Sequence, residues 1–181
     1  MDIDKIENPV QGDTIIFRRT AEETDGDFLE FDMQLEPSAG GPPQHVHPKA
    51  EERFEVLAGK VQAEIANKTD HFAEEDTFVV PSGVAHRWWN EGKEKAKVRV
   101  RLEPATRMGE FLRTWYALAQ DGKMNENGLP SIWQLAVTSA EYLDSVHLAQ
   151  PPLIVQKIMW GTLAPIARLM GYKADYPYPY E

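Results

Sequence analysis

Residues 45–59 read HVHPKAEERFEVLAG and residues 81–90 read PSGVAHRWWN, and these two stretches hold three of the chain's five histidines. In an extended strand, residues i and i+2 point to the same side. His45 and His47 are therefore predicted to face one point in space. Two imidazoles at this spacing are the strand equivalent of the i, i+4 pair that binds metal on a helix.

A carboxylate and a third imidazole complete a candidate metal site. Glu52 opens the strand that follows the first pair and can direct its carboxylate to the same point, and His86 comes from the second stretch. Three imidazoles and one carboxylate suit a divalent ion such as Fe(II), Mn(II), Ni(II), Cu(II) or Zn(II). On an octahedral metal this donor set leaves room for water or substrate, which indicates a working site rather than a structural one.

The sequence before Pro104 alternates with a period of two, as in Val98 and Val100 against Arg99 and Arg101. The pattern predicts strands over residues 13–20, 27–36, 52–58, 60–66, 77–80, 85–90 and 96–103. Turns are predicted between them at residues 58–60, 67–70, 81–83 and 90–92. Many short strands with regularly spaced turns are typical of an antiparallel sandwich or barrel.

The pattern becomes helical after Pro104. The predicted helices are one from about 105 to 120, one from the N-cap Ser131 to about Leu148, and one over about 153–170 that Pro165 kinks. We expect two parts in the chain, a β-barrel domain over 1–104 and a helical extension over 105–181. The extension is expected to pack on the barrel or at a dimer interface.

The two histidine stretches resemble the two motifs of the cupin superfamily. The first reads His45-Val46-His47, four residues, Glu52, six residues, Gly59, and the second reads Pro81-Ser82-Gly83, two residues, His86, three residues, Asn90. The resemblance covers about residues 27–103, and the short segment 60–74 is similar to that of compact bacterial cupins. It implies a mainly β fold, an antiparallel jelly-roll barrel, here followed by about three α-helices.

The resemblance also implies a ligand set. The motif positions that bind metal in cupins are here His45, His47, Glu52 and His86. Glu52 is preferred over Glu51 because it stands six residues before Gly59, as the motif requires. Two glycines of the family pattern are replaced, by Ala39 and Glu75, at turns rather than at ligands.

Strand alternation predicts which side chains line a substrate pocket inside the barrel. They are Met33, Phe54, Val56, Trp88 and Asn90. Plain core packing is the alternative role for Trp88. A pocket of this composition is largely apolar, which favours a hydrophobic or aromatic substrate.

The ligand set resembles that of cupin enzymes that use oxygen to cleave an aromatic or enol substrate. In such a dioxygenase-type reaction Glu52 would act as the base. One alternative is a metal-dependent isomerase or epimerase of a sugar or keto acid. Another is a non-catalytic cupin that binds a small molecule, because one fold hosts many functions.

Composition excludes several other functions. The chain has 19 Lys and Arg against 29 Asp and Glu, a formal net charge of −10, which disfavours nucleic-acid binding. It has no Cys, so disulfides and thiolate ligands are excluded. No apolar stretch reaches the roughly 20 residues of a membrane span, and the amino terminus lacks the apolar segment of a secretory signal. We therefore expect a cytoplasmic protein whose partner is a small-molecule substrate.

The remaining features have plainer expected roles. His71 is expected in a solvated turn, and His147 at the C-terminal end of the second helix, where a positive charge is favourable. The aromatic residues of the helices exceed what one packed helix needs, which suggests a cap over one barrel mouth, a homodimer, or both. The alternative is a tail that only completes the core. Prolines keep the tail over 176–180 extended, either across a neighbouring protomer or as a disordered end.

Overall fold

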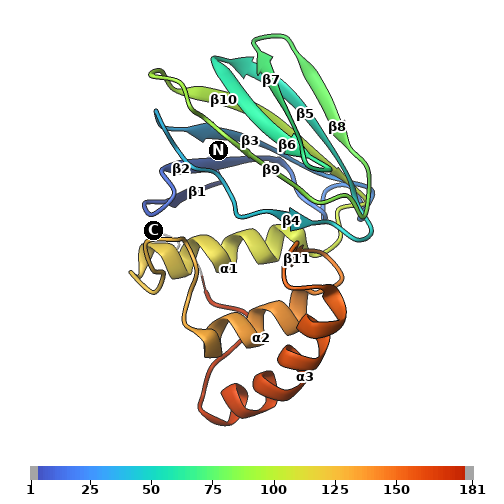
Figure 1. The fold of residues 1–181 in the computed structure, drawn as a ribbon, viewed down its shortest axis with the longest axis vertical. Coiled ribbons are helices and arrows are strands. Elements are labelled where there is room, and N and C mark those ends of the chain that lie inside the picture. The colour runs from blue at the N-terminus through green and yellow to red at the C-terminus, as the bar shows by residue number, and fades with distance from the viewer. Residues whose placement is uncertain (1–3, 178–181) are drawn as a thin grey trace.

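The computed structural model describes residues 4–177, which contain two antiparallel sheets (Figure 1). The larger sheet has the strand order β1-β2-β3-β10-β5-β8. Its strands are β1 Lys5–Asn8, β2 Asp13–Arg19, β3 Leu29–Leu35, β10 Ala96–Glu103, β5 Glu51–Ala58 and β8 Thr77–Val80. The smaller sheet has the order β11-β4-β9-β6-β7. Its strands are β11 His147–Leu148, β4 His45–Val46, β9 His86–Trp89, β6 Lys60–Ile65 and β7 Lys68–Ala73.

The core lies between the two sheets, and the alternation of β10 shows how the sequence builds it. Val98, Val100 and Leu102 are fully buried, and every second residue points outward instead. Val100 lies opposite Phe31 of β3 on one side and Phe54 of β5 on the other, so three inward rows meet in register. The sheets thus close into the predicted jelly-roll barrel.

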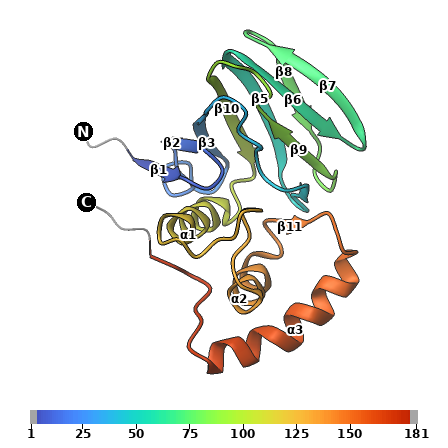
Figure 2. The same cartoon turned by 60° about the vertical axis from the view of Figure 1, so that its left-hand side comes forward.

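Helices α1 Met108–Gln120, α2 Ile132–Tyr142 and α3 Leu153–Leu169 follow the barrel (Figure 2). Figure 2 shows α1 beside the barrel end, α2 below it, and α3 farther out. Ser131 caps α2 as predicted, because its hydroxyl accepts a hydrogen bond from the backbone N–H of Gln134. Pro165 lies inside α3, which continues beyond it.

The structure differs from the sequence prediction at β7. A turn was predicted over residues 67–70, but the reversal occupies only Ala66 and Asn67, and β7 begins at Lys68. Both turn residues have positive φ, 49° and 65°, as a two-residue hairpin turn of the favoured twist requires. His71 therefore lies in strand β7 rather than in a turn, and its side chain is exposed there.

The second helix is shorter than predicted, and the expected role of His147 is wrong. The backbone N–H groups of Ser145 and Val146 both bond to the Tyr142 carbonyl, which closes the last turn. The chain then extends into β11, which pairs with β4 and places His147 opposite Val46. A strand edge presents unpaired backbone groups, and this pairing satisfies them. β1 is a further strand that the period-two pattern did not indicate.

None of the helices within residues 4–177 has the length and apolar character needed to cross a membrane. The predicted extended tail lies mostly outside the described residues. Its first part, at Tyr176, donates a hydroxyl hydrogen bond to Asp121 and a backbone N–H bond to the Thr114 hydroxyl. The homodimer and the division at residue 104 stay predictions.

Candidate metal centre

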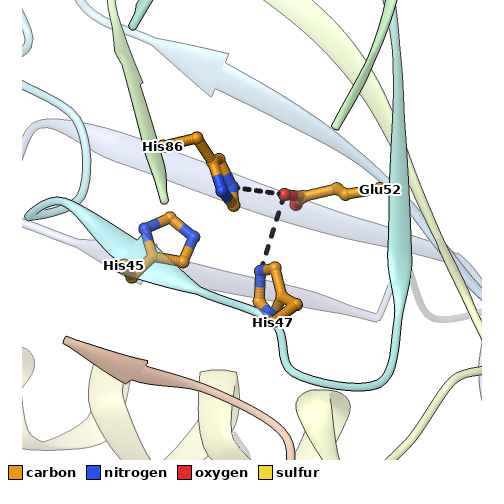
Figure 3. Close-up of side chains that lie close together, drawn as sticks. All are labelled: His45, His47, Glu52 and His86. Carbon is orange, nitrogen blue, oxygen red and sulfur yellow. Dashed lines mark hydrogen bonds and ion pairs between the residues drawn. The ribbon is translucent and has the colours of Figure 1, made fainter. Parts of the chain in front are cut away.

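Four side chains from three β-segments converge inside the barrel (Figure 3). His45 comes from β4, His47 from the residue just after it, Glu52 from β5 and His86 from β9. One donor atom from each lies within 4.8 Å of all the others, and each residue is at most 8% exposed. The strand pairing of His45 with His86 across β4 and β9 joins two of them, and Glu52 faces them from the opposite sheet.

Each imidazole is oriented by a hydrogen bond on its outer nitrogen. The Nδ1 atoms lie 2.9, 2.9 and 3.1 Å from the backbone carbonyl oxygens of Pro43, Ser145 and Val84, for His45, His47 and His86 respectively. A carbonyl oxygen only accepts, so each Nδ1 carries a hydrogen and donates it. The lone pair of a neutral ring is then on Nε2, which is the arrangement that metal-binding histidines show.

The inner nitrogens and the carboxylate meet at short range. Glu52 Oε2 lies 2.8 Å from His86 Nε2 and 3.5 Å from His47 Nε2, as the dashed lines of Figure 3 mark. Within the described residues, the buried His47 Nε2 has no hydrogen-bond partner at normal distance. A buried nitrogen left without a partner is costly unless another group occupies the space before it. This donor set and this geometry therefore fit a cation held among the four side chains.

The surroundings shift the pKa values of the cluster residues in different directions. Burial alone would raise the pKa of Glu52, but the charge of nearby His47 and the charge and hydrogen bond of His86 hold it well below its usual range. Burial and the two neighbouring imidazoles lower the pKa of His45 well below its ordinary value. Burial opposes protonation of His47 too, yet the charge of Glu52 raises its pKa. The cluster thus combines an ionised carboxylate with imidazoles that compete for few protons, and a divalent cation can replace those protons.

A cavity of about 110 Å³ opens from the cluster toward the helical extension. On the barrel side it is lined by Gln11, Asp13, Ile15, Phe31, Met33, Pro42, Pro43, His45, His47, Glu52 and Trp88. The extension contributes Met108, Phe111, Leu112, Trp115, Tyr116, Leu135, Ser139, Val146, His147 and Leu148. The helices therefore close one mouth of the barrel, and most of the wall is aromatic or aliphatic.

The structure divides the five residues predicted to line the pocket. Met33 and Trp88 lie in the cavity wall. Phe54 and Val56 lie in the packed core instead, where the Phe54 ring is 5.4 Å from that of Trp88. Asn90 holds a turn: its amide nitrogen donates to the carbonyls of Glu36 and Glu94, and its amide oxygen accepts from the Gly92 N–H. Alternation identifies the inner face of a strand but not how deep along the barrel the cavity reaches.

Asp13 and Tyr116 are polar wall residues that the sequence did not single out. Asp13 begins β2 on the inward face of its strand, so its alternation with Ile15 was a usable signal. Tyr116 sits on α1, and nothing in the local sequence says that this face of the helix covers the barrel. His147 reaches the wall in the same way, through β11.

Two turns of the barrel depend on backbone conformation. Gly41 has a φ of +67°, and a Cβ added there would lie 1.8 Å from the Trp88 carbonyl oxygen, so only glycine lets this loop pack on β9. Glu75 stands where the cupin pattern has a glycine, and it adopts a φ of 74°. Its backbone N–H still bonds to the Val56 carbonyl, so the turn forms without the glycine.

Comparison with known proteins agrees with the geometry. The family model described as "Cupin domain" matches residues 31–102. The protein named "Probable oxidoreductase virH", from Hypocrea virens, is 28% identical over 149 residues, covering 75% of this chain and 66% of its own length. An oxidoreductase from Arthrobotrys oligospora is 30% identical over 99 residues, covering 50% of this chain and 39% of its own. The chain thus spans less than two thirds of each of these relatives.

A solved structure shares the fold. The sugar phosphate isomerase from a cupin superfamily of Silicibacter pomeroyi superimposes with a TM-score of 0.51 at 17% identity, over 58% of this chain and 73% of that one. At this identity the likeness shows the fold alone. The family match, the jelly-roll barrel and the motif residues at its centre agree with one another, so residues 31–102 of this chain are a cupin domain.

Proposed function

We propose that this cupin is an enzyme that holds one divalent transition metal and carries out an oxygen-dependent, dioxygenase-type reaction on a small aromatic or enol substrate. The observation that carries the proposal is the buried cluster of three imidazoles and one carboxylate at the edge of a mainly apolar cavity. The curated relatives, both named oxidoreductases, support the reaction class.

The ligands follow from the side-chain orientations. The Nε2 atoms of His45, His47 and His86 and a carboxylate oxygen of Glu52 would hold the ion, because the three Nδ1 atoms are engaged by backbone carbonyls. A bound transition metal supplies Lewis-acid chemistry and access to oxygen. Borderline donors of this kind select among Fe(II), Mn(II), Ni(II), Cu(II) and Zn(II) only weakly, so supply and geometry decide the ion.

Glu52 is the group best placed to accept a proton from a bound substrate. It lies in the cavity wall with its carboxylate beside two imidazoles. The nearby His47 and the hydrogen bond of His86 make it a weak base, since they hold its pKa down.

The cavity wall favours an aromatic or enol-type ligand over a phosphorylated sugar. Trp88 and Met33 come from the barrel, and Phe111 and Trp115 from α1. The two α1 rings stack in the cavity wall with their centroids 5.3 Å apart. Arg87, Arg99 and Arg101 make their ion pairs with acidic side chains such as Glu64, Asp32 and Glu103 and are absent from the cavity wall of the described residues.

Metal analysis followed by an oxygen-electrode assay tests this function. Purified protein should contain about one transition ion per chain, and Fe(II)-loaded protein should consume oxygen with a member of a panel of flavonols, catechols, thiols and β-diketones. His86→Ala should abolish uptake, whereas the exposed His71→Ala should leave it unchanged. Turnover that is insensitive to oxygen would favour the isomerase alternative, and binding without turnover would favour the non-catalytic one. Absence of uptake across the whole panel would overturn the proposal.

A further inference from the structure

Asp13 is a buried carboxyl group in the wall of the metal-side cavity that the ligand set does not use. It begins β2 and is 4% exposed. Its strand partners are Asn8 of β1 and Leu35 of β3, neither of which is charged. The cavity reaches from the His and Glu cluster to this carboxyl group.

Nothing in residues 4–177 neutralises a negative charge on Asp13. The carboxyl group belongs to none of the ion pairs in this part of the chain. From α1 the hydroxyl of Tyr116 interacts with it, and Gln11 beside it is uncharged. The other titratable groups of the cavity wall are the cluster members His45, His47 and Glu52, and His147 of β11.

This environment favours the neutral acid. Burial raises the pKa of Asp13 to about 7, and the hydrogen bond of Tyr116 lowers it only in part. A protonated carboxyl group has an O–H donor that an ionised one lacks. An uncompensated carboxyl is costly in a core, and an amide would give a similar shape at less cost, so a ligand-facing role accounts for the residue better than packing does.

We propose that Asp13 is a second recognition point of this cavity, where its carboxyl O–H donates a hydrogen bond to an acceptor oxygen of the ligand. The inference rests on the proposed function, in which the other end of the ligand meets the metal. It narrows the ligand class to small molecules with metal-binding oxygens at one end and a carbonyl or similar acceptor at the other. Tyr116 is the positioning residue, since it acts through the Asp13 carboxyl.

A matched pair of ligands tests the inference by binding rather than turnover. Catechol provides only the chelating oxygens, and 3,4-dihydroxyacetophenone adds a carbonyl acceptor on the opposite side of the ring. Calorimetric titration of Zn(II)-loaded protein without oxygen gives both affinities. At pH values below the Asp13 pKa of about 7, the carbonyl should strengthen binding roughly three- to tenfold, the worth of one hydrogen bond.

Variants test whether Asp13 causes the stronger binding of the carbonyl ligand. Asp13→Leu should remove the preference for the carbonyl ligand, so that the two ligands bind this variant with equal affinity. Asp13→Asn should keep it at all pH values, because an amide donates without titrating. In wild type the preference should disappear well above pH 7, and Tyr116→Phe should extend it to higher pH, because the bond that lowers the Asp13 pKa is lost. The exposed Asp70→Asn serves as the control.

Equal affinity of wild type for the two ligands at low pH, or an unchanged preference in Asp13→Leu, would overturn the inference. If the Asp13 variants do not fold, the wild-type pH profile and Tyr116→Phe decide it. Infrared difference spectra of metal-free protein give a second measurement: a protonated carboxyl band should be present below pH 7 and absent from Asp13→Asn. Absence of this band in wild type refutes the inference but not the proposed function, whereas failure to bind any transition metal refutes the proposed function even if the Asp13 carboxyl band is present.

Discussion

Glu52 and Asp32 are two buried carboxylates on opposite faces of the same sheet, and their partners differ in kind. Glu52 of β5 points into the barrel at two imidazoles. Asp32 of β3 points outward and is fully buried beneath Arg18, Lys97 and Arg99, with its oxygens 2.6, 3.2 and 2.9 Å from their nitrogens. Imidazole can give up a proton and bind a metal, whereas guanidinium stays charged and only donates. The same acid chemistry therefore gives a candidate site inside and a structural ion pair outside.

Removal of an imidazole should produce the largest effect. His86→Ala is expected to weaken metal affinity more than about hundredfold and to leave the protein folded, because a working site contributes little to the stability of a barrel this well packed. Competition with a chelator measures the affinity, and circular dichroism measures the fold. His71→Ala, in exposed β7, is the matched control. An unfolded His86→Ala would instead indicate a structural ion.

Removal of the Asp32 carboxylate should instead lower the stability of the fold and leave metal affinity unchanged. Asp32→Asn is expected to lower the free energy of unfolding by about 2 kcal/mol, because it breaks charge-assisted hydrogen bonds to partly exposed cations. Metal affinity should stay the same, since Asp32 lies outside the barrel. Urea denaturation measures the first quantity and chelator competition the second. A loss of metal in Asp32→Asn would show that the two faces are coupled.

The smallest expected effect is a change with pH in the stability that Asp32 contributes. Burial raises the pKa of Asp32, but Arg99, Arg18 and Lys97 outweigh it and hold the folded-state pKa below its ordinary value of 3.8. A lowered folded pKa stabilises the protein above the unfolded value, and this contribution is lost as the pH falls through the folded value. The difference in unfolding free energy between wild type and Asp32→Asn should therefore be constant near neutral pH and shrink below about pH 4. A difference independent of pH would assign the loss to packing rather than charge.

Local patterns explain why the barrel and its metal cluster could be predicted. Alternation in β10 depends on neighbours along one strand, and the spacing of His45, His47 and Glu52 is set within eight consecutive residues. His86 followed because its motif resembles the second half of the cupin pattern. Turn lengths were less certain, since Ala66 and Asn67 alone reverse the chain where four turn-type residues suggested a longer loop.

Contacts between distant segments were the part that could not be predicted. The early end of α2 depends on the edge of β4, about a hundred residues earlier in the chain. The Nδ1 hydrogen bond of His47 to the Ser145 carbonyl links the cluster to the helical extension in the same way. Neither leaves a periodic signal, because each is satisfied only after the extension has packed on the barrel.

The sequence by itself determined an antiparallel sandwich or barrel, because residue alternation acts over short distances, and its resemblance to the cupin motifs implied the jelly roll and the four side chains of the candidate metal centre. Only the tertiary structure decided that helices α1 and α2 close the cavity and that Asp13 and Tyr116 face each other in its wall. The physical reason is burial: how costly a carboxyl is, and what it can do, depends on which distant groups exclude water from it.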